Sequence, residues 1–449
     1  MNYKNNFSLS KKTVSVVLLI LSFATLFVPN TYGIIWLLLI CLSGTIDKSL
    51  VIPIVVIDWL VGNLNPGLFL SDNITPITRF SLIYYFFLLA ILNFFRISLN
   101  KGNDRKIRYE YIILVSALLI GVIHSSIFSF YPDVSILKLL NLFALFFIII
   151  DWLKTTPNFQ KEYSLKVTVS ILSLIILTSI PLLFFDVGYL RDGSFQGILG
   201  HPQAFGIFLS LMSAMYFIIW HAYIEGSRYH LIILGISVIM LFMTSARTAL
   251  LALLITITVY LFRYYFKPSY KKILVLSGYV LLLFSISNLY FIDEFLNKSG
   301  GDFNIINGYE ISRGFLLAPM IDNMIEHPMG IGFGIQNGGK DFVIVYDSLF
   351  NLPISAPTEK GLLYLEIIEE FGIFLGSIIL FILLKIGLYS LSSAKVGPMI
   401  VLCIMLINVA ESTLLSPAGM GMLFIPLFLI GIYHPNIFYH KKVHQSPLV

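Results

Sequence analysis

Long apolar runs, separated by short polar stretches, occupy most of the chain. A helix that crosses a bilayer needs roughly 20 apolar residues, and it satisfies its backbone hydrogen bonds within one segment. The pattern therefore predicts an all-α fold, a polytopic transmembrane helical bundle of about 12–14 spans. Several runs are short for a straight crossing, so we expect some helices to be tilted, half-buried or re-entrant. The expected cores are residues 13–29, 31–43, 49–63, 79–97, 111–130, 134–153, 166–185, 199–222, 229–244, 247–264, 272–292, 361–384, 397–414 and 417–433.

One long polar stretch interrupts this pattern between residues 293 and 360. It is rich in Gly, Asn and Asp, and a long loop of that kind is more often functional than a spacer. Within it, residues 315–327 have the spacing of an amphipathic helix lying on the membrane, with Met320 and the neighbouring Ile residues expected on one side. A His-Pro pair at 327–328 should end this helix, and the Gly-rich stretch 330–334 should turn the chain back.

Domain organisation and orientation follow from the same pattern. We expect one integral membrane domain over residues 1–449, with 293–360 as a large external loop containing short amphipathic helices and 361–433 as the C-terminal spans. Lys and Arg collect in cytoplasmic loops. When the amino terminus, with Lys11 and Lys12, is placed in the cytoplasm, most of the 29 Lys and Arg fall in cytoplasmic connections. Both termini are then cytoplasmic, and the long polar loop faces away from cytoplasmic ATP.

Composition agrees with a membrane protein and narrows the chemistry. The chain is 57% hydrophobic and 12% charged, with a mean hydropathy of +0.89, whereas soluble domains carry about 25% charged residues. Its net charge of +5 fits basic loops on one membrane face and not a nucleic-acid patch. Its two cysteines, Cys41 and Cys403, lie inside apolar runs and give no metal or disulfide pattern.

Sequence motifs for nucleotide or metal chemistry do not occur in the chain. There is no P-loop, no HExxH and no GxSxG, so we expect neither metal nor cofactor. An enzyme at the external face without them must use an already activated substrate. Lipid diphosphate-linked sugars are the common case.

Two arginines stand out at predicted external positions. Arg247 lies in Thr-Ser-Ala-Arg-Thr between two apolar runs, where a charged group is costly unless it pairs with an anion. Its neighbouring hydroxyls favour a polar pocket over the alternative, a single interfacial arginine that reaches toward the headgroups. Arg313 lies in the polar loop, where a solvated charge is the ordinary alternative.

Histidine and glutamate candidates lie at two predicted helix starts. His201 precedes Pro202, and the free N–H groups of such a start suit a phosphate or hydroxyl; the alternative is a capping histidine. Glu359, Glu366 and Glu370 have helical spacing, and acids inside a span must face protein or water. Glu359 is a candidate general base, and a helix cap paired with its neighbouring lysine is the alternative.

In this order, the motifs resemble those of the O-antigen ligase and O-antigen polymerase superfamily of bacterial envelope glycosyltransferases. The resemblance covers roughly residues 190–433. Its elements are a Gly-x-x-Gly-His-Pro stretch, a Thr-Ser-x-Arg stretch, an external loop arginine, a His-Pro-x-Gly-x-Gly-x-Gly stretch and a Leu-Glu helix with Gly-Ile-x-x-Gly. They occupy residues 197–202, 244–247, 313, 327–334 and 365–376.

The resemblance implies a reaction and a site. A sugar hydroxyl of an acceptor attacks the anomeric carbon of a glycan carried on undecaprenyl diphosphate, at the outer face of the bacterial cytoplasmic (inner) membrane. Arg247 and Arg313 match the arginines thought to hold the diphosphate. From the residues themselves, and not from the resemblance, we expect Glu359 to act as the base and His201, Glu366 and Arg191 to contact substrate.

Within the superfamily, the residues before the Leu-Glu helix favour a polymerase of lipid-linked repeat units. Ligases often carry a His-Asn pair there, and residues 358–360 are Thr-Glu-Lys instead. The expected partners are the lipid-linked glycan donor, the lipid-linked acceptor and the lipid bilayer. A chain-length regulator is a further candidate partner, and nucleic acid is not expected to bind. An O-antigen ligase, a polysaccharide flippase or transporter, and a non-catalytic scaffold remain the alternatives.

Overall fold

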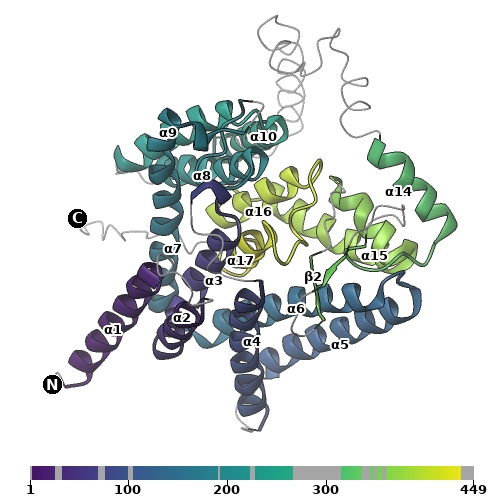
Figure 1. Cartoon of the computed structure of the whole chain (residues 1–449), viewed down its shortest axis with the longest axis horizontal. Coiled ribbons are helices and arrows are strands. Elements are labelled where there is room, and N and C mark those ends of the chain that lie inside the picture. The colour runs from purple at the N-terminus through teal and green to yellow at the C-terminus, as the bar shows by residue number, and fades with distance from the viewer. Residues whose placement is uncertain are drawn as a thin grey trace, which may run out of the picture.

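The structure is a computed structural model, and it describes residues 3–25, 33–68, 76–99, 105–190, 193–222, 228–265, 315–335, 344–346, 351–355 and 361–435. Within these ranges the fold is almost wholly helical (Figure 1). The α-helices are α1 (Tyr3–Thr25), α2 (Ile34–Ile46), α3 (Val51–Gly62), α4 (Pro76–Leu99), α5 (Arg105–Phe128), α6 (Pro132–Thr155), α7 (Asn158–Ser179), α8 (Pro202–Ala222), α9 (Arg228–Met243), α10 (Arg247–Tyr265), α14 (Phe315–Glu326), α15 (Leu363–Leu391), α16 (Val396–Ile407) and α17 (Gly421–Tyr433).

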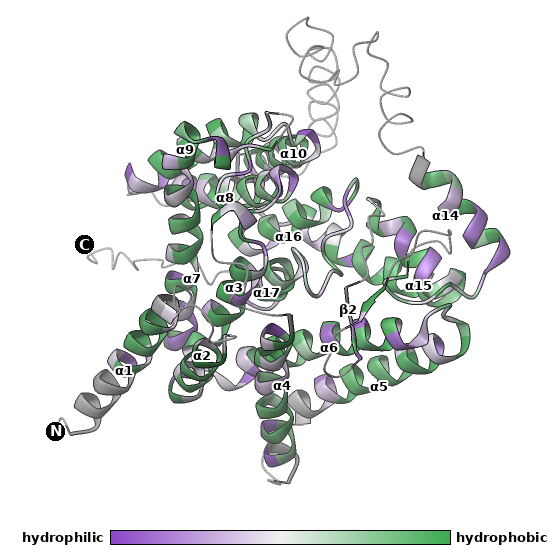
Figure 2. Cartoon of the chain, in the orientation of Figure 1, coloured by the Kyte–Doolittle hydropathy of each residue, from purple (hydrophilic) through white to green (hydrophobic). Residues whose placement is uncertain are grey.

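These helices confirm the predicted all-α polytopic membrane fold. Seven are long and apolar enough to cross a membrane, and shorter apolar helices accompany them. Hydrophobic residues run along most of their lengths (Figure 2). Every predicted span falls on one of these helices except 272–292, which lies outside the described residues.

Three of the short helices, α3, α16 and α17, lie in the interior of the bundle. Every residue of α3 from Val51 to Val61 is buried, and α16 and α17 are buried along nearly their whole lengths. A helix that is apolar all round belongs inside a bundle, because it has no polar side to show to water. In Figure 1, α16 and α17 lie near the centre, with α8, α9 and α10 above them and α5 and α6 to the lower right.

Contacts between helix ends show that the segments connecting the helices lie at two opposite faces of the bundle. On the first, which we call the site face, the starts of α8, α10 and α15 meet the α16–α17 connection through Glu411. On the opposite, basic face, Lys154 pairs with Glu110 at 2.7 Å, and Arg263 Nε donates to the carbonyl of Leu391 at 2.7 Å. This alternation of faces agrees with the order of spans in the sequence. Which face is cytoplasmic stays a prediction.

The long helix α15 is broken at Gly372, whose φ of 74° and ψ of 174° are accessible essentially only to glycine. The turn after α14 fits into this break. Ile331 N–H donates to the Glu369 carbonyl at 3.0 Å, Gly332 N–H to the Glu370 carbonyl at 3.1 Å, and Ile373 N–H to the Pro328 carbonyl at 2.9 Å. We call this arrangement, residues 328–332 with 369–373, the Gly372 joint.

Helix α14 is amphipathic, as predicted, and ends just before His327. The expectation that its Ile residues share one side with Met320 is wrong. Met320 and Asn323 are buried against the protein, whereas Ile321 and Ile325 are 47% and 74% exposed. The side of α14 that packs against the protein carries Asn323 together with Met320. The Asn323 side-chain amide donates a hydrogen bond to Glu369 of α15. A two-stranded antiparallel sheet, β1 (Val345–Tyr346) with β2 (Pro353–Ser355), lies farther along the same loop.

Candidate functional site

Three of the six predicted site residues lie in the part of the chain that the structure describes. These are His201, Arg247 and Glu366, and they belong to or directly precede α8, α10 and α15. The other three, Arg191, Arg313 and Glu359, lie outside the described residues.

His201 directly precedes α8, and its side chain is exposed. Its Nδ1 atom accepts a hydrogen bond at 3.2 Å from the backbone N–H of Gln203, in the first turn of the helix. This is the capping geometry that the sequence left open as an alternative. Two backbone bonds tie the segment before it to the α3–α4 connection: Asn65 N–H to the Ile198 carbonyl, and Gly200 N–H to the Asn63 carbonyl.

Arg247 is the first residue of α10 and is half-buried. A tight turn separates α10 from α9, with Ser245 in the left-handed region at φ 57°. Thr244 stabilises this turn, because its Oγ1 accepts from Ala246 N–H at 3.3 Å and donates to the Leu241 carbonyl at 2.8 Å. The Thr244 hydroxyl therefore shapes the backbone that leads into Arg247.

Gly206 lets α8 approach this turn closely. A Cβ atom at that position would overlap Ala246 and Thr244, so no larger residue fits without moving one of the two helices. One turn further along α8, Ser210 Oγ donates to the Ala249 carbonyl of α10 at 2.6 Å. The His-Pro and Thr-Ser-x-Arg motifs therefore sit on two directly packed helices.

Glu411 links these motifs, and the sequence did not single it out. Its Oε1 atom accepts from Gln203 Nε2 at 2.5 Å and from Thr248 Oγ1 at 3.2 Å. Its side chain is 7% exposed. We call Gln203, Thr248 and Glu411 the three-helix corner, because it joins the α8 and α10 starts to the α16–α17 connection. One signal in the sequence could have identified Glu411. It is an acid within the apolar run 397–414, and a buried acid needs a partner.

Acidic residues of α15 are buried, as predicted for acids within a span. Glu366, Glu369 and Glu370 are 9%, 1% and 1% exposed. Asn323 Nδ2 of α14 donates to Glu369 Oε1 at 2.7 Å. Glu366 lies within the first turn of α15, close in sequence to Leu363, whose N–H donates to the Glu411 carbonyl.

The Gly-rich turn is anchored to the fold on both sides. His124 Nε2 donates to the Met329 carbonyl at 2.6 Å, and Lys138 Nζ donates to the Gly334 carbonyl at 2.6 Å. The N–H groups of Ile331 and Gly332 donate to α15. The N–H groups of Ile331 and Gly332 therefore hold the turn against α15.

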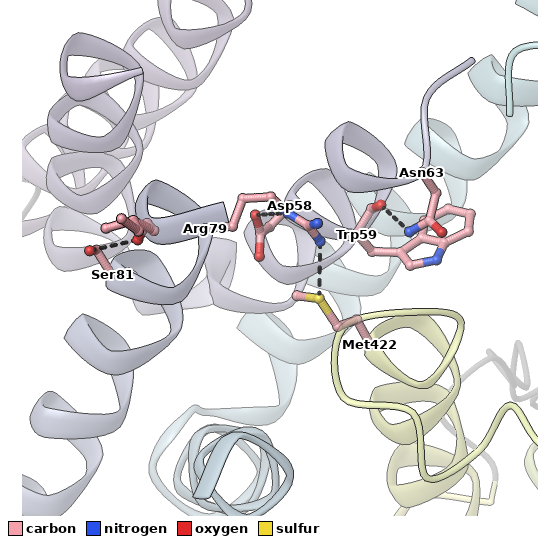
Figure 3. A network of polar contacts seen from close by, with 7 residues as sticks. Asp58, Trp59, Asn63, Arg79, Ser81 and Met422 are labelled. Atoms are coloured by element: carbon pink, nitrogen blue, oxygen red, sulfur yellow. Dashed lines mark hydrogen bonds and ion pairs between the residues drawn. The ribbon is translucent and has the colours of Figure 1, made fainter. Parts of the chain in front are cut away.

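A buried ion pair on α3 and α4 was also missed by the sequence analysis (Figure 3). Arg79 Nε donates to Asp58 Oδ1 at 3.2 Å, and Arg79 Nη2 lies 3.6 Å from Met422 Sδ of α17. The Asp58 side chain is 1% exposed and that of Arg79 19%. This network ties two amino-terminal helices to a carboxy-terminal one. Among the described residues, no three His, Cys, Asp or Glu side chains gather as a metal site.

The fold and the corner define a multi-pass helical membrane protein with a polar site at one set of helix ends. Residues 232–380 match the family model described as O-antigen ligase. This stretch of the chain is similar to the O-antigen ligase family, which is consistent with the O-antigen ligase and polymerase superfamily, whose members are glycosyltransferase-like enzymes. The match confirms the resemblance seen in the sequence, and it includes Arg247, Arg313 and Glu359. No curated protein matches the chain.

Proposed function

We propose that this protein is a polymerase of oligosaccharide repeat units carried on undecaprenyl diphosphate. Its products would be O-antigen, capsule or exopolysaccharide, and it would act at the outer face of the bacterial cytoplasmic membrane. The observation that carries this proposal is the family match over residues 232–380. Supporting it, Arg247 lies within the match and at the helix ends that the three-helix corner joins.

Arg247 suits the leaving diphosphate. Negative charge gathers on the diphosphate as the glycosidic bond breaks, and a positioned guanidinium can grip two of its oxygens. Arg247 also opens α10, where the positive end of the helix dipole favours an anion. Arg313, within the matched region, is proposed as the second diphosphate-binding arginine.

Glu359 is proposed as the general base in the transfer step. The acceptor hydroxyl gives its proton to the Glu359 carboxylate as its oxygen bonds to the anomeric carbon of the donor glycan. The bond between that carbon and the diphosphate oxygen breaks, and the lipid diphosphate leaves with the electron pair. Attack opposite the leaving group inverts the anomeric centre. His201, Glu366 and Arg191 are proposed to contact the sugars.

A ligase is the second candidate, because the matching family model is itself described as O-antigen ligase. Purified protein in nanodiscs should be given lipid-linked repeat units without nucleotide, together with lipid A core as a competing acceptor. A polymerase lengthens the lipid-linked glycan into a ladder. Transfer to lipid A core alone would show a ligase, and no transfer to either acceptor would reject both.

The site face is proposed to be external. Single cysteines at Gly338 and Ala418 should react with a membrane-impermeant thiol reagent in cells whose outer membrane is permeabilised. A cysteine at Ser392, beside the basic face, should react only after the inner membrane is broken. The reverse pattern would overturn the proposed orientation.

A further inference from the structure

We infer that Glu411 is the positioning residue of the proposed transfer site. It sets the starts of α8 and α10, and through them Arg247, without itself touching substrate. The inference rests on the proposed function for its catalytic consequence, whereas the geometry it describes stands independently.

The side chain of Glu411 connects two helices through one oxygen. Oε1 accepts from Gln203 Nε2 of α8 and from Thr248 Oγ1 of α10. Thr248 directly follows Arg247, so this bond fixes the rotation of the helix turn that presents the guanidinium. Hydrogen bonds to an ionised acceptor are roughly twice as strong as those between neutral groups.

Electrostatics favour a negative charge at this place. Gln203 and Thr248 lie in the first turns of α8 and α10, so the carboxylate sits beside two helix amino termini. A carboxylate near a helix amino terminus stabilises the helix, because it complements the positive end of the helix dipole. Glutamine at 411 would keep one acceptor oxygen and lose the charge.

The backbone of Glu411 holds a third helix. Its carbonyl accepts from Leu363 N–H, in the first turn of α15, at 3.2 Å. Leu363 follows the proposed base, Glu359, by four positions in the sequence. One residue therefore links the helix that bears Arg247 to the helix that follows the proposed base.

The connection that carries Glu411 is itself held in a defined shape. Asn408 Oδ1 accepts from the N–H groups of Thr413 and Leu414, both at 2.9 Å, and from Thr413 Oγ1 at 3.2 Å. Asn408 is fully buried. The carboxylate is thus presented from a preformed turn, as a positioning group requires.

The kinetic test is a reciprocal exchange of side chains. Glu411→Gln and Gln203→Glu should each lower kcat about 10–100-fold with little change in KM, because a misplacement of about 1 Å can cost about 100-fold. The double variant restores a carboxylate–amide pair with its polarity reversed, and it should recover most of kcat. A double variant no better than the worse single would overturn the inference, because position 411 itself would then need the carboxylate. A Glu411→Gln protein with wild-type kcat would overturn it as well.

Two matched variants at Thr248 test the same hydrogen bond without changing position 411. Thr248→Ser retains the hydroxyl and should keep wild-type kcat, whereas Thr248→Val keeps the shape and should lower it. Equal activity in the two variants would contradict the role of this bond.

A structural readout separates the inference from the proposed function. Spin labels at Ser245 and Ala418, both exposed, report the distance between the α9–α10 turn and the α16–α17 connection. Their distance distribution should broaden in Glu411→Ala and narrow again in the Gln203→Glu/Glu411→Gln exchange. Unchanged distributions would overturn the positioning role even if wild-type protein shows no transfer. Loss of transfer by wild-type protein with the expected distances would instead reject the proposed function alone.

Discussion

The three-helix corner and the Gly372 joint are both junctions of distant segments, yet they are made differently. At the corner, the Glu411 carboxylate accepts one hydrogen bond from a side-chain amide and one from a side-chain hydroxyl. At the joint, three backbone hydrogen bonds and a glycine-only conformation hold a loop inside a broken helix. We therefore expect changes at the corner to affect transfer more than folding, and changes at the joint to affect folding more than transfer.

The largest effect on stability is expected at the buried ion pair of Asp58 and Arg79. Like the corner, this pair is built around a carboxylate, and like the joint, it is buried inside the bundle. Arg79→Met leaves the Asp58 carboxyl without its ion-pair partner inside the bundle, and breaking a buried pair costs about 3–5 kcal/mol. Thermal unfolding in detergent should show this loss. Replacing both residues, as in Asp58→Leu/Arg79→Met, should be less harmful than Arg79→Met alone, and the opposite order would refute the pairing.

Next to the corner, Arg247→Ala should reduce transfer about 100–1,000-fold, the usual effect of removing one electrostatic group from a transition state. Its thermal unfolding should match wild type. Arg247→Lys should recover only part of the rate, because an ammonium cannot grip two oxygens in a fork. Arg228→Ala, an exposed arginine at the start of α9, is the control and should stay active. Equal rates in Arg247→Ala and wild type would remove Arg247 from the site.

At the joint, Gly372→Ala should act on folding and not on chemistry. An alanine held at φ 74° and ψ 174° costs about 1–3 kcal/mol, and its Cβ would overlap the backbone of Met329. The amount of folded protein in membranes should fall, and activity per folded molecule should hold. Gly235→Ala, in α9 with open space around it, is the matched control. A stable but inactive Gly372→Ala protein would contradict the expectation that the joint acts on folding and the corner on chemistry.

The smallest effect concerns His434, on the basic face. Burial, with help from Lys161 and Lys154, lowers the pKa of this histidine. The folded protein therefore keeps His434 neutral while the unfolded chain takes up a proton below about pH 6.5. Stability should fall as the pH drops below that value, until the lowered pKa of the folded protein is passed. His434→Asn should remove this slope in melting curves, and identical slopes would contradict the assignment.

Much of the fold could be predicted because span length and hydropathy are properties of single segments. The helix that begins at Phe315 and the buried acids of α15 both followed from local patterns. Pairings between segments could not be predicted in this way. Glu411 and Asp58 were visible as acids in apolar runs, but nothing in the sequence indicates that Thr248 or Arg79 would meet them. The break at Gly372 could not be seen in the predicted span 361–384, because an isolated glycine is also tolerated inside a continuous helix.

The most direct test of the account measures product and leaving group together. Purified wild-type protein in nanodiscs receives lipid-linked repeat units and no nucleotide, and released undecaprenyl diphosphate is counted against new glycosidic linkages. We expect one lipid diphosphate to be released for each linkage formed, and both products to be lost together in Arg247→Ala. Linkages formed without release of lipid diphosphate, or equal release by Arg247→Ala and wild type, would contradict it.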